Sequence, residues 1–326
     1  MRRFLVCCAL LLGARRAVAQ TGVANEGALE LIRPIGARSL GMGLVGTASA
    51  FNTDAVWVNP ALITRTGREA SFDFRNQANA AEAESDVAGV LVWPFNPVGS
   101  VAVFARYINN GSQDVALGPN NQVGTFAITD LIIGASLATT FFDRLAVGFT
   151  AKQERVNFSC TGECTQLGVA SARTPTANAL DFGSQFFVTK DSSISVGAAV
   201  MNIGPKFQLI DSPQADPLPS RASVGVQYTP KITGVPGLDA HFAADIVTRV
   251  SSGTGLGYRA GAELSYLKRY QLRAGYIKSG PVGEDTPTIG LGLTSGKIHI
   301  DLSQMMTNLG GTGGSRPTFL TLRFDF

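Results

Sequence analysis

The sequence predicts an all-β protein: a 14-stranded antiparallel transmembrane β-barrel with a short N-terminal helical hatch inside it. Three observations lead to this fold class. Fourteen segments alternate apolar and polar residues with a period of two, as in strands whose two faces meet different surroundings. Charged residues make up 16% of the chain, against roughly 25% in soluble domains. No long apolar run follows the first 19 residues, so a bundle of membrane-spanning helices is excluded.

The first element, residues 1–19, has the layout of a secretory signal peptide. Two arginines precede an apolar run at residues 4–12, and small residues lead to a cleavage site after Ala19. We therefore expect signal-peptide-dependent export. Four of the 27 basic residues and none of the 24 acidic ones lie in this segment. The rest of the chain is close to neutral, and its charge gives no reason to expect nucleic-acid binding.

Residues 20–67 do not alternate, and we expect them to form the hatch. Glycines divide this segment into short apolar pieces, and two short helices or turns are expected at residues 37–51 and 54–63. Residues 41–46 match the dinucleotide-binding pattern G-x-G-x-x-G, but no strand–helix–strand unit surrounds them. These glycines are therefore expected to let short helices pack closely against the barrel wall.

From residue 68 to residue 326 the chain is expected to form the barrel. Each predicted strand is long enough to cross an apolar band of ~25 Å when tilted. The strands are predicted at residues 69–79, 86–95, 98–108, 125–139, 144–158, 176–190, 193–203, 220–230, 238–249, 257–267, 270–279, 286–295, 297–306 and 316–326.

The connections between the strands alternate in length. Short links, such as residues 96–97 and 191–192, alternate with long ones, such as residues 109–124 and 159–175. Residues 230–237 are the exception among the short links. Outer-membrane barrels place short turns on the inner side and long loops outside. The composition also allows a soluble β-sandwich, but a sandwich has no reason to keep this alternation.

Charged side chains share one face of several strands, and we expect that face to line the lumen, because charge at mid-depth on the lipid side is costly. The expected lumen polar network comprises His241, Asp245, Arg259, Glu263, Arg273, His299 and Asp301. A catalytic acid–base set is the alternative interpretation. The sequence has no G-x-S-x-G elbow and no His–Glu metal motif, so we expect no enzyme activity, no metal site and no cofactor.

Cys160 and Cys164 remain after the signal peptide, within a predicted long outward loop. In an oxidising compartment, two cysteines at this spacing predict a small disulfide ring. A zinc site would need two further ligands, and no histidine is near in sequence.

The last strand ends flush with the C-terminus at Phe326, and its apolar residues share one face. It looks like the terminal recognition strand of bacterial outer-membrane barrels. Phe324 and Phe326 are therefore predicted to form the C-terminal signal for the barrel-assembly machinery. We expect an integral protein of the bacterial outer membrane, in contact with its lipid.

Several motifs together resemble a known family. The N-terminal motif comprises Gly41, Gly43, Asp54, Asn59, Pro60 and Ala61. Further motifs lie at residues 201–206, 217–219, 225–228, 261–263, 272–276, 290–293 and 300–301. This combination resembles the PorV/PorQ family, which is related to FadL, the outer-membrane long-chain fatty-acid transporter. Residues 301–302 read Asp-Leu where PorV-like proteins usually carry aspartate–tyrosine.

The resemblance implies a FadL-like barrel plugged by an N-terminal hatch, without catalytic residues. PorV-like members work in type IX secretion, so the implied function is secretion or surface-protein assembly. The implied partners are secretion-system subunits or the C-terminal domains of cargo proteins. The alternative is FadL-like passive transport of hydrophobic molecules such as long-chain fatty acids. An apolar pocket would favour transport, and a polar, blocked lumen would favour a scaffold.

Overall fold

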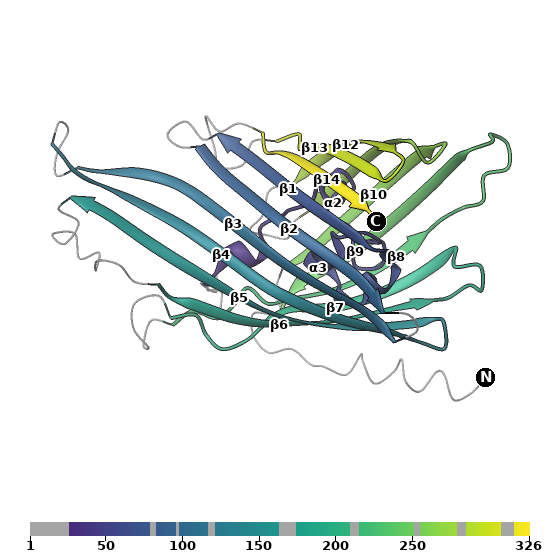
Figure 1. The fold of residues 1–326 in the computed structure, drawn as a ribbon, viewed down its shortest axis with the longest axis horizontal. Helices are drawn as coiled ribbons and strands as arrows, with labels where there is room; N and C mark the ends of the chain where they lie inside the picture. The colour runs from purple at the N-terminus through teal and green to yellow at the C-terminus, as the bar shows by residue number, and fades with distance from the viewer. Residues whose placement is uncertain are drawn as a thin grey trace.

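The computed structural model describes residues 26–78, 83–95, 98–116, 121–162, 174–208, 215–250, 255–278, 285–307 and 316–326. The predicted signal peptide lies outside these residues. Within them, fourteen strands form one closed antiparallel barrel (Figure 1). The barrel closes because β1 pairs with both β2 and β14. The predicted fold class is confirmed.

The fourteen strands follow one another around the barrel in chain order. They are β1 (Glu69–Ala78), β2 (Ala83–Phe95), β3 (Gly99–Ala116), β4 (Gln122–Phe141), β5 (Leu145–Gly162), β6 (Thr176–Phe187), β7 (Ile194–Ile203), β8 (Arg221–Tyr228), β9 (Leu238–Arg249), β10 (Leu256–Tyr266), β11 (Tyr270–Lys278), β12 (Thr286–Ser295), β13 (Ile298–Met305) and β14 (Thr318–Asp325). We call the end with the β4–β5 and β12–β13 turns the short-turn end, and the opposite end the long-loop end.

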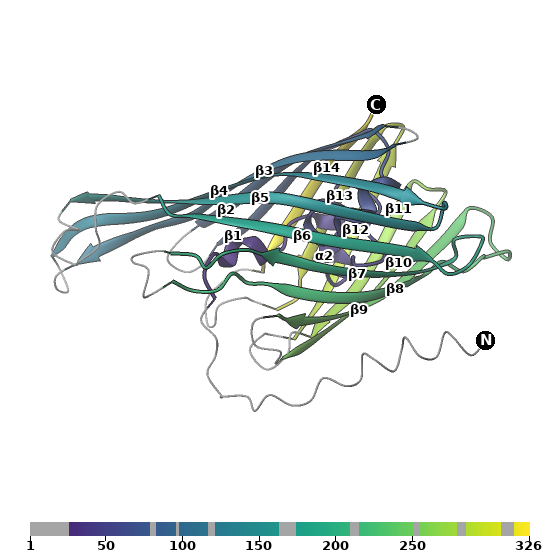
Figure 2. The ribbon, with the colours of Figure 1, turned by 90° about the horizontal axis from the view of Figure 1, so that it is seen from below.

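Strands β3, β4 and β5 are longer than predicted and project beyond the rest of the barrel (Figures 1 and 2). Much of the predicted loops at residues 109–124 and 159–175 is therefore strand: β3 continues to Ala116, β4 begins at Gln122 and β5 continues to Gly162. The loop prediction was wrong here for a physical reason. Beyond the apolar belt both faces of a hairpin meet water, so the alternation stops although the hydrogen-bonded ladder continues.

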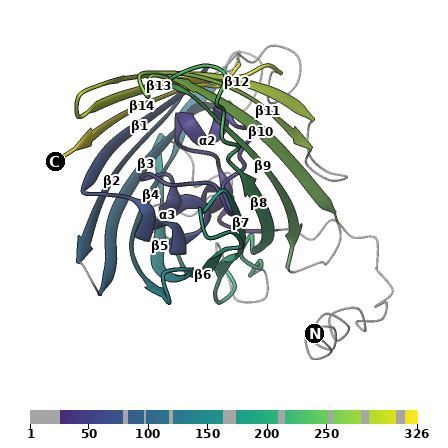
Figure 3. The same cartoon turned by 90° about the vertical axis from the view of Figure 1, so that its right-hand side faces the viewer.

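The short helices of the hatch lie inside the barrel (Figure 3). They are η1 (Leu29–Ile32), α2 (Ala37–Gly41), α3 (Ala55–Val58) and η2 (Pro60–Arg65). None of the helices in the described part of the chain is long and apolar enough to cross a membrane.

Both predicted hatch helices are shorter than expected. The first ends at Gly41 because Gly43 and Leu44 have φ values of 71° and 59°, which a right-handed helix does not allow. The second is divided at Asn59, which is extended (φ −155°) in front of Pro60. Proline disfavours a helical conformation in the residue before it and has no N–H to continue the helix.

The outer face of the wall is apolar around the barrel. Side chains that alternate with buried ones are 38–62% exposed, among them Phe74, Val103, Leu131, Phe182, Val224, Phe242, Ile246, Leu264, Leu272, Leu291 and Leu302. An exposed apolar surface of this extent is suited to a hydrocarbon surrounding. The opposite face of the same strands carries the buried charges, which places the candidate site in the lumen.

Candidate functional site: the hatch and the lumen

The hatch lies directly on the barrel wall because the wall carries glycines where the two backbones meet. At these positions a Cβ would overlap an atom of the hatch or of a side chain that holds it, or, at Gly290, come within 3.0 Å of the hatch backbone. They are Gly148, Gly183, Gly197, Gly225, Gly261, Gly275 and Gly290, and we call them the wall glycines. Gly41 and Gly43 belong to the same contact, since Gly41 packs on Gly290 and Gly43 on the backbone around Tyr276. The glycines are thus used for close approach of the two backbones.

Two polar residues of the predicted hatch motif fix its shape. Asn59 donates from Nδ2 to the carbonyl oxygens of Thr47 (2.7 Å) and Ser184 (3.0 Å), and its Oδ1 accepts from the N–H of Ala61 (3.1 Å). Asp54 accepts from the N–H (3.0 Å) and the hydroxyl (2.7 Å) of Ser39. Asn59 therefore ties the hatch to itself and to β6, and Asp54 joins α2 to α3. Pro60 and Ala61 are fully buried in η2.

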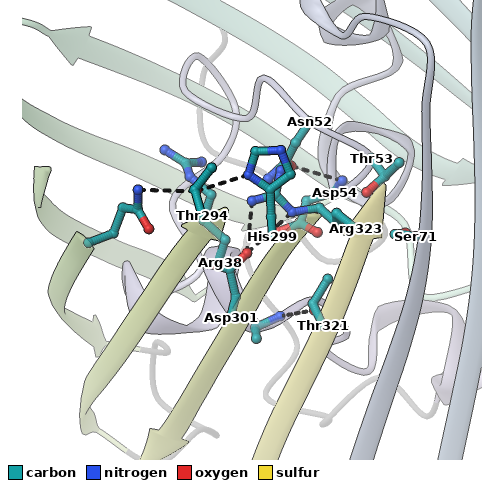
Figure 4. A network of polar contacts seen from close by, with 12 residues as sticks. Arg38, Asn52, Thr53, Asp54, Ser71, Thr294, His299, Asp301, Thr321 and Arg323 are labelled. Atoms are coloured by element: carbon teal, nitrogen blue, oxygen red, sulfur yellow. Dashed lines mark hydrogen bonds and ion pairs between the residues drawn. The ribbon is translucent and has the colours of Figure 1, made fainter. Parts of the chain in front are cut away.

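A chain of buried ion pairs runs from the hatch along the wall and back to the hatch. Arg38 donates to both carboxylate oxygens of Glu263, at 3.0 and 3.2 Å. Arg273 bridges Glu263 and Asp301, and Arg323 bridges Asp301 (2.8 Å) and Glu69 (3.4 Å). Figure 4 shows Arg38, Asp301 and Arg323 with the hatch residues around them.

The other carboxylate oxygen of Glu69 accepts from the N–H of Thr53 at 2.8 Å, which returns the chain of contacts to the hatch. We call Arg38, Glu263, Arg273, Asp301, Arg323 and Glu69 the ion-pair chain. All six are less than 10% exposed, and their three positive charges balance their three negative charges.

The predicted lumen polar network is divided into separate groups. Glu263, Arg273 and Asp301 belong to the ion-pair chain. Asp245 instead accepts from the N–H of Gly46 (2.8 Å) and from the N–H and hydroxyl of Thr47, and Arg259 donates to the carbonyl oxygen of Leu44 (3.2 Å).

The two histidines also stand apart. His241 hydrogen-bonds Thr229 at 3.0 Å, and His299 contacts Thr294 and Asp325, both at 3.0 Å. Asp245 and Arg259 thus hold the hatch, whereas His241 and His299 bond residues of the wall near its short-turn end. Among the described residues no group of three or more His, Cys, Asp or Glu side chains could hold a metal ion.

A polar cavity of about 260 Å³ lies between the hatch and strands β9 to β14. Hatch residues Arg38 and Phe51 line it together with His241, His299 and Lys268. The guanidinium carbon of Arg38 lies 3.9 Å from the centre of the Phe51 ring, and that ring lies 5.6 Å from the His241 ring. The cavity extends to Lys268, in the β10–β11 turn at the short-turn end.

On the side of β3 to β6, two apolar clusters lie in the lumen among buried charged residues. One cluster surrounds α3 and η2 and includes Phe104, Ile108 and Ile132, with Trp57 packed edge-on against Phe104 (ring centres 4.7 Å apart). A second cluster lies nearer the long-loop end and includes Ala28, Val156, Ala177, Ala179, Phe207 and Leu218, with Ile128 and Phe158 against it.

These two clusters are continuous. Leu31 of the hatch packs against both. Farther along the projecting strands, Phe126 stacks on Phe158 with ring centres 5.8 Å apart. We call this sequence of side chains, from Phe126 and Phe158 through Leu31 to Trp57 and Phe104, the apolar track.

Charged residues flank the apolar track at the level of η1. Arg33 pairs with Glu30 (2.6 Å) and with Glu84 (3.4 Å), and Arg106 pairs with Asp86. Burial raises the pKa of Glu30, although the positive charge of Arg33 acts to lower it.

Two predicted features remain, the disulfide and the C-terminal phenylalanines, and they lie at opposite ends of the barrel. Cys160, in β5, takes part in a disulfide, and Cys164 lies outside the described residues. Phe326 donates its N–H to the carbonyl oxygen of Arg68 (3.1 Å) and lies 5.8 Å from the Trp93 ring, while Phe324 is 37% exposed. Recognition of Phe324 and Phe326 by the barrel-assembly machinery stays a prediction.

Several residues of the site were not predicted. Arg38 lies in the hatch, where no periodicity indicates which way a side chain points. Glu69, Arg323 and Glu154 continue alternations that the sequence shows clearly, so extending the period-two pattern would have placed all three in the lumen.

The chain forms a closed barrel with an apolar exterior and a hatch in its lumen. No family model matches the sequence, and no curated protein matches it. Solved structures share the fold at low identity. The Ralstonia pickettii toluene transporter TbuX is 16% identical, with 89% of this chain and 98% of that chain covered and a TM-score of 0.58.

Two further structures give similar values. The monoaromatic hydrocarbon channel CymD is 14% identical, with 93% and 99% of the two chains covered and a TM-score of 0.58. A Pseudomonas aeruginosa FadL homologue is 10% identical, with 90% and 99% covered and a TM-score of 0.55. At these identities the likeness shows the fold. It does not extend to membership of the PorV/PorQ family.

Proposed function

We propose that this protein is a non-enzymatic channel of the bacterial outer membrane that passes small hydrophobic molecules. The apolar exterior suits a bilayer, and the similar solved structures are described as a toluene transporter, a hydrocarbon channel and a FadL homologue. The passive-transport alternative is thus better supported than the secretion role.

The apolar track is the observation that carries this proposal. A barrel that served only as a scaffold would need apolar side chains where the hatch packs on the wall, but not farther out at Phe126 and Phe158. In this structure the track is packed against the hatch, so passage requires movement of the hatch or of the lining side chains. The polar cavity occupies the other half of the lumen, between the hatch and the short-turn end.

Uptake by intact cells tests the proposal, because lipopolysaccharide hinders hydrophobic molecules that cross simple lipid vesicles unaided. The host should lack its own FadL-type channels, and uptake of labelled toluene should be measured at low micromolar concentration. We expect faster uptake with the protein than with an empty vector. Phe158→Ser should reduce uptake severalfold, because it places a hydroxyl in the track.

Phe149→Ser is the matched control. It changes the same residue type in the same strand but on the outward face, where Phe149 packs against Phe182 (ring centres 5.3 Å apart). It should leave uptake close to wild type at equal amounts of folded protein. Uptake no faster than the empty vector would refute the proposal.

The secretion role implied by the PorV/PorQ resemblance stays a prediction. It would place a cargo C-terminal domain or a secretion-system subunit against the long-loop end. Detergent extraction followed by co-purification with surface-protein C-terminal domains is its test, and recovery of such a domain would favour it over transport.

A further inference from the structure

Glu154 is a buried carboxylate in the wall of the apolar track. It lies on the inward face of β5 and is 1% exposed. Its cross-strand partners are Ile132, which belongs to one apolar cluster, and Ala177, which belongs to the other. Both of its carboxylate oxygens are buried, and neither has a hydrogen-bond partner among the described residues.

The cations nearest in the lumen are already engaged. Lys152, two residues away on the same face of β5, pairs with Asp181 at 2.8 Å. Arg106 pairs with Asp86 and also donates to the carbonyl oxygen of Arg33 at 2.8 Å.

A second carboxylate nearby, Asp130, accepts from Nδ2 of Asn110 at 2.7 Å and forms no ion pair within the described part of the chain. In this part of the lumen the described carboxylates outnumber the cations by two. The carboxylates are Glu30, Glu84, Asp86, Asp130, Glu154 and Asp181, and the cations are Arg33, Arg75, Arg106 and Lys152.

We propose that Glu154 selects the ligands of the track by charge, favouring apolar molecules with an ammonium or hydroxyl end over apolar carboxylates. This inference rests on the proposed function and gives it a substrate class. A buried carboxylate without a partner gains a charge-assisted hydrogen bond from a ligand N–H or O–H. A ligand carboxylate would instead add a third negative charge beside Glu154 and Asp130. Long-chain fatty-acid anions are therefore poor ligands for this track.

Equilibrium binding tests the selectivity separately from uptake. Three probes share one apolar body and differ at one end: octylamine, 1-octanol and octanoate. Binding of each labelled probe should be measured at pH 9, at which carboxyl groups are ionised and octylamine is still an ammonium ion, to protein in nanodiscs of neutral lipid, with empty nanodiscs subtracted. We expect octylamine to bind most tightly, octanol less tightly, and octanoate at least tenfold more weakly than octylamine.

Two variants locate the effect. Glu154→Gln should reduce the octylamine-to-octanoate affinity ratio at least tenfold. Gln153→Glu adds a carboxylate one residue away on the exposed outer face and should leave the ratio within twofold of wild type. Heat-dependent gel mobility confirms that each variant is folded.

Two results would overturn the inference: octanoate binding to the wild type as tightly as octylamine, or an unchanged ratio in folded Glu154→Gln. If Glu154→Gln does not fold, the order of the three affinities for the wild type tests the inference. Toluene uptake equal to the empty vector refutes the proposed channel, while the binding order still tests the role of Glu154.

Discussion

The arginines of the ion-pair chain show why particular residue types are needed in this lumen. Arg273 and Arg323 each contact two carboxylates, and Arg38 contacts both oxygens of Glu263. A planar guanidinium with five N–H donors can bridge two acids, whereas a lysine ammonium acts as a single compact charge. The arrangement leaves the charges of the ion-pair chain balanced and joins the wall to the hatch through the Arg38 side chain and the N–H of Thr53.

Removing one carboxylate from the ion-pair chain should destabilise the folded barrel. Glu263→Gln leaves Arg38 and Arg273 buried without one of their acids, and breaking such a buried pair costs about 3–5 kcal/mol. The expected result is a clear fall in the temperature at which the detergent-solubilised protein loses its β-sheet circular dichroism.

The control is Lys231→Met, which removes a 3.3 Å ion pair with Asp191 in which the lysine side chain is 79% exposed. Its unfolding temperature should not change measurably, because exposed pairs contribute little. Equal falls in both variants, or none in Glu263→Gln, would show that the ion-pair chain does not hold the structure together.

At the scale of elements, the wall glycines determine how closely the hatch approaches the strands. Backbone atoms near Met42, Gly43, Thr47 and Ala61 occupy the space that wall side chains would otherwise fill. The hatch thereby gains close contact with strands on both sides of the lumen, although its helices are only four to six residues long. Helices of this length are not stable alone, so their conformation depends on the wall.

A methyl group at a wall glycine should therefore displace the hatch. In Gly261→Ala the new Cβ would overlap the carbonyl oxygen of Met42, a backbone atom that cannot rotate away. Overpacking of this kind costs about 1–3 kcal/mol. The expected results are a lower unfolding temperature and a higher ion conductance in planar lipid membranes.

Gly89→Ala is the comparison, since its Cβ would have its nearest neighbour at 3.9 Å, an ordinary contact. Both measurements should match the wild type for Gly89→Ala. If Gly261→Ala matches it too, the hatch is held loosely and close packing on the wall is unimportant.

The sequence predicted the strands better than the hatch, and the reason is physical. A strand between two different surroundings shows a local period of two, so the inward positions of Glu263, Arg273 and Asp301 follow from the sequence near each of them. The partners of Arg38 depend on how the hatch docks, and no local pattern encodes docking. The lengths of β3 and β5 were underestimated because their outer parts have water on both faces.

At the scale of the whole molecule, the lumen combines two chemistries around one hatch. On the wall, the ion-pair chain and the polar cavity lie along β9 to β14 and β1, and the apolar track follows strands β3 to β6. The hatch contacts both halves, through Arg38 on one side and Leu31 and Trp57 on the other. A shift of the hatch would therefore alter the ion pairs and the apolar packing together.

Closure of the barrel should make the protein an integral membrane protein whose mobility depends on heating. Deleting residues 318–326 removes β14 and leaves β1 and β13 as open edges, whose unpaired N–H and C=O groups cannot be satisfied in hydrocarbon. The full chain should need detergent for extraction and migrate differently on gels before and after boiling. The deletion variant should lose the faster, unboiled form.

Replacing residues 113–126 with Asn-Gly shortens the projecting β3–β4 hairpin without touching the β1–β14 pairing, so this variant should keep the faster form. Two results would contradict this prediction: a full-length chain that stays soluble without detergent, or a deletion variant that still shows the heat-sensitive form. Either would mean that insertion into a membrane does not depend on closure through β1 and β14.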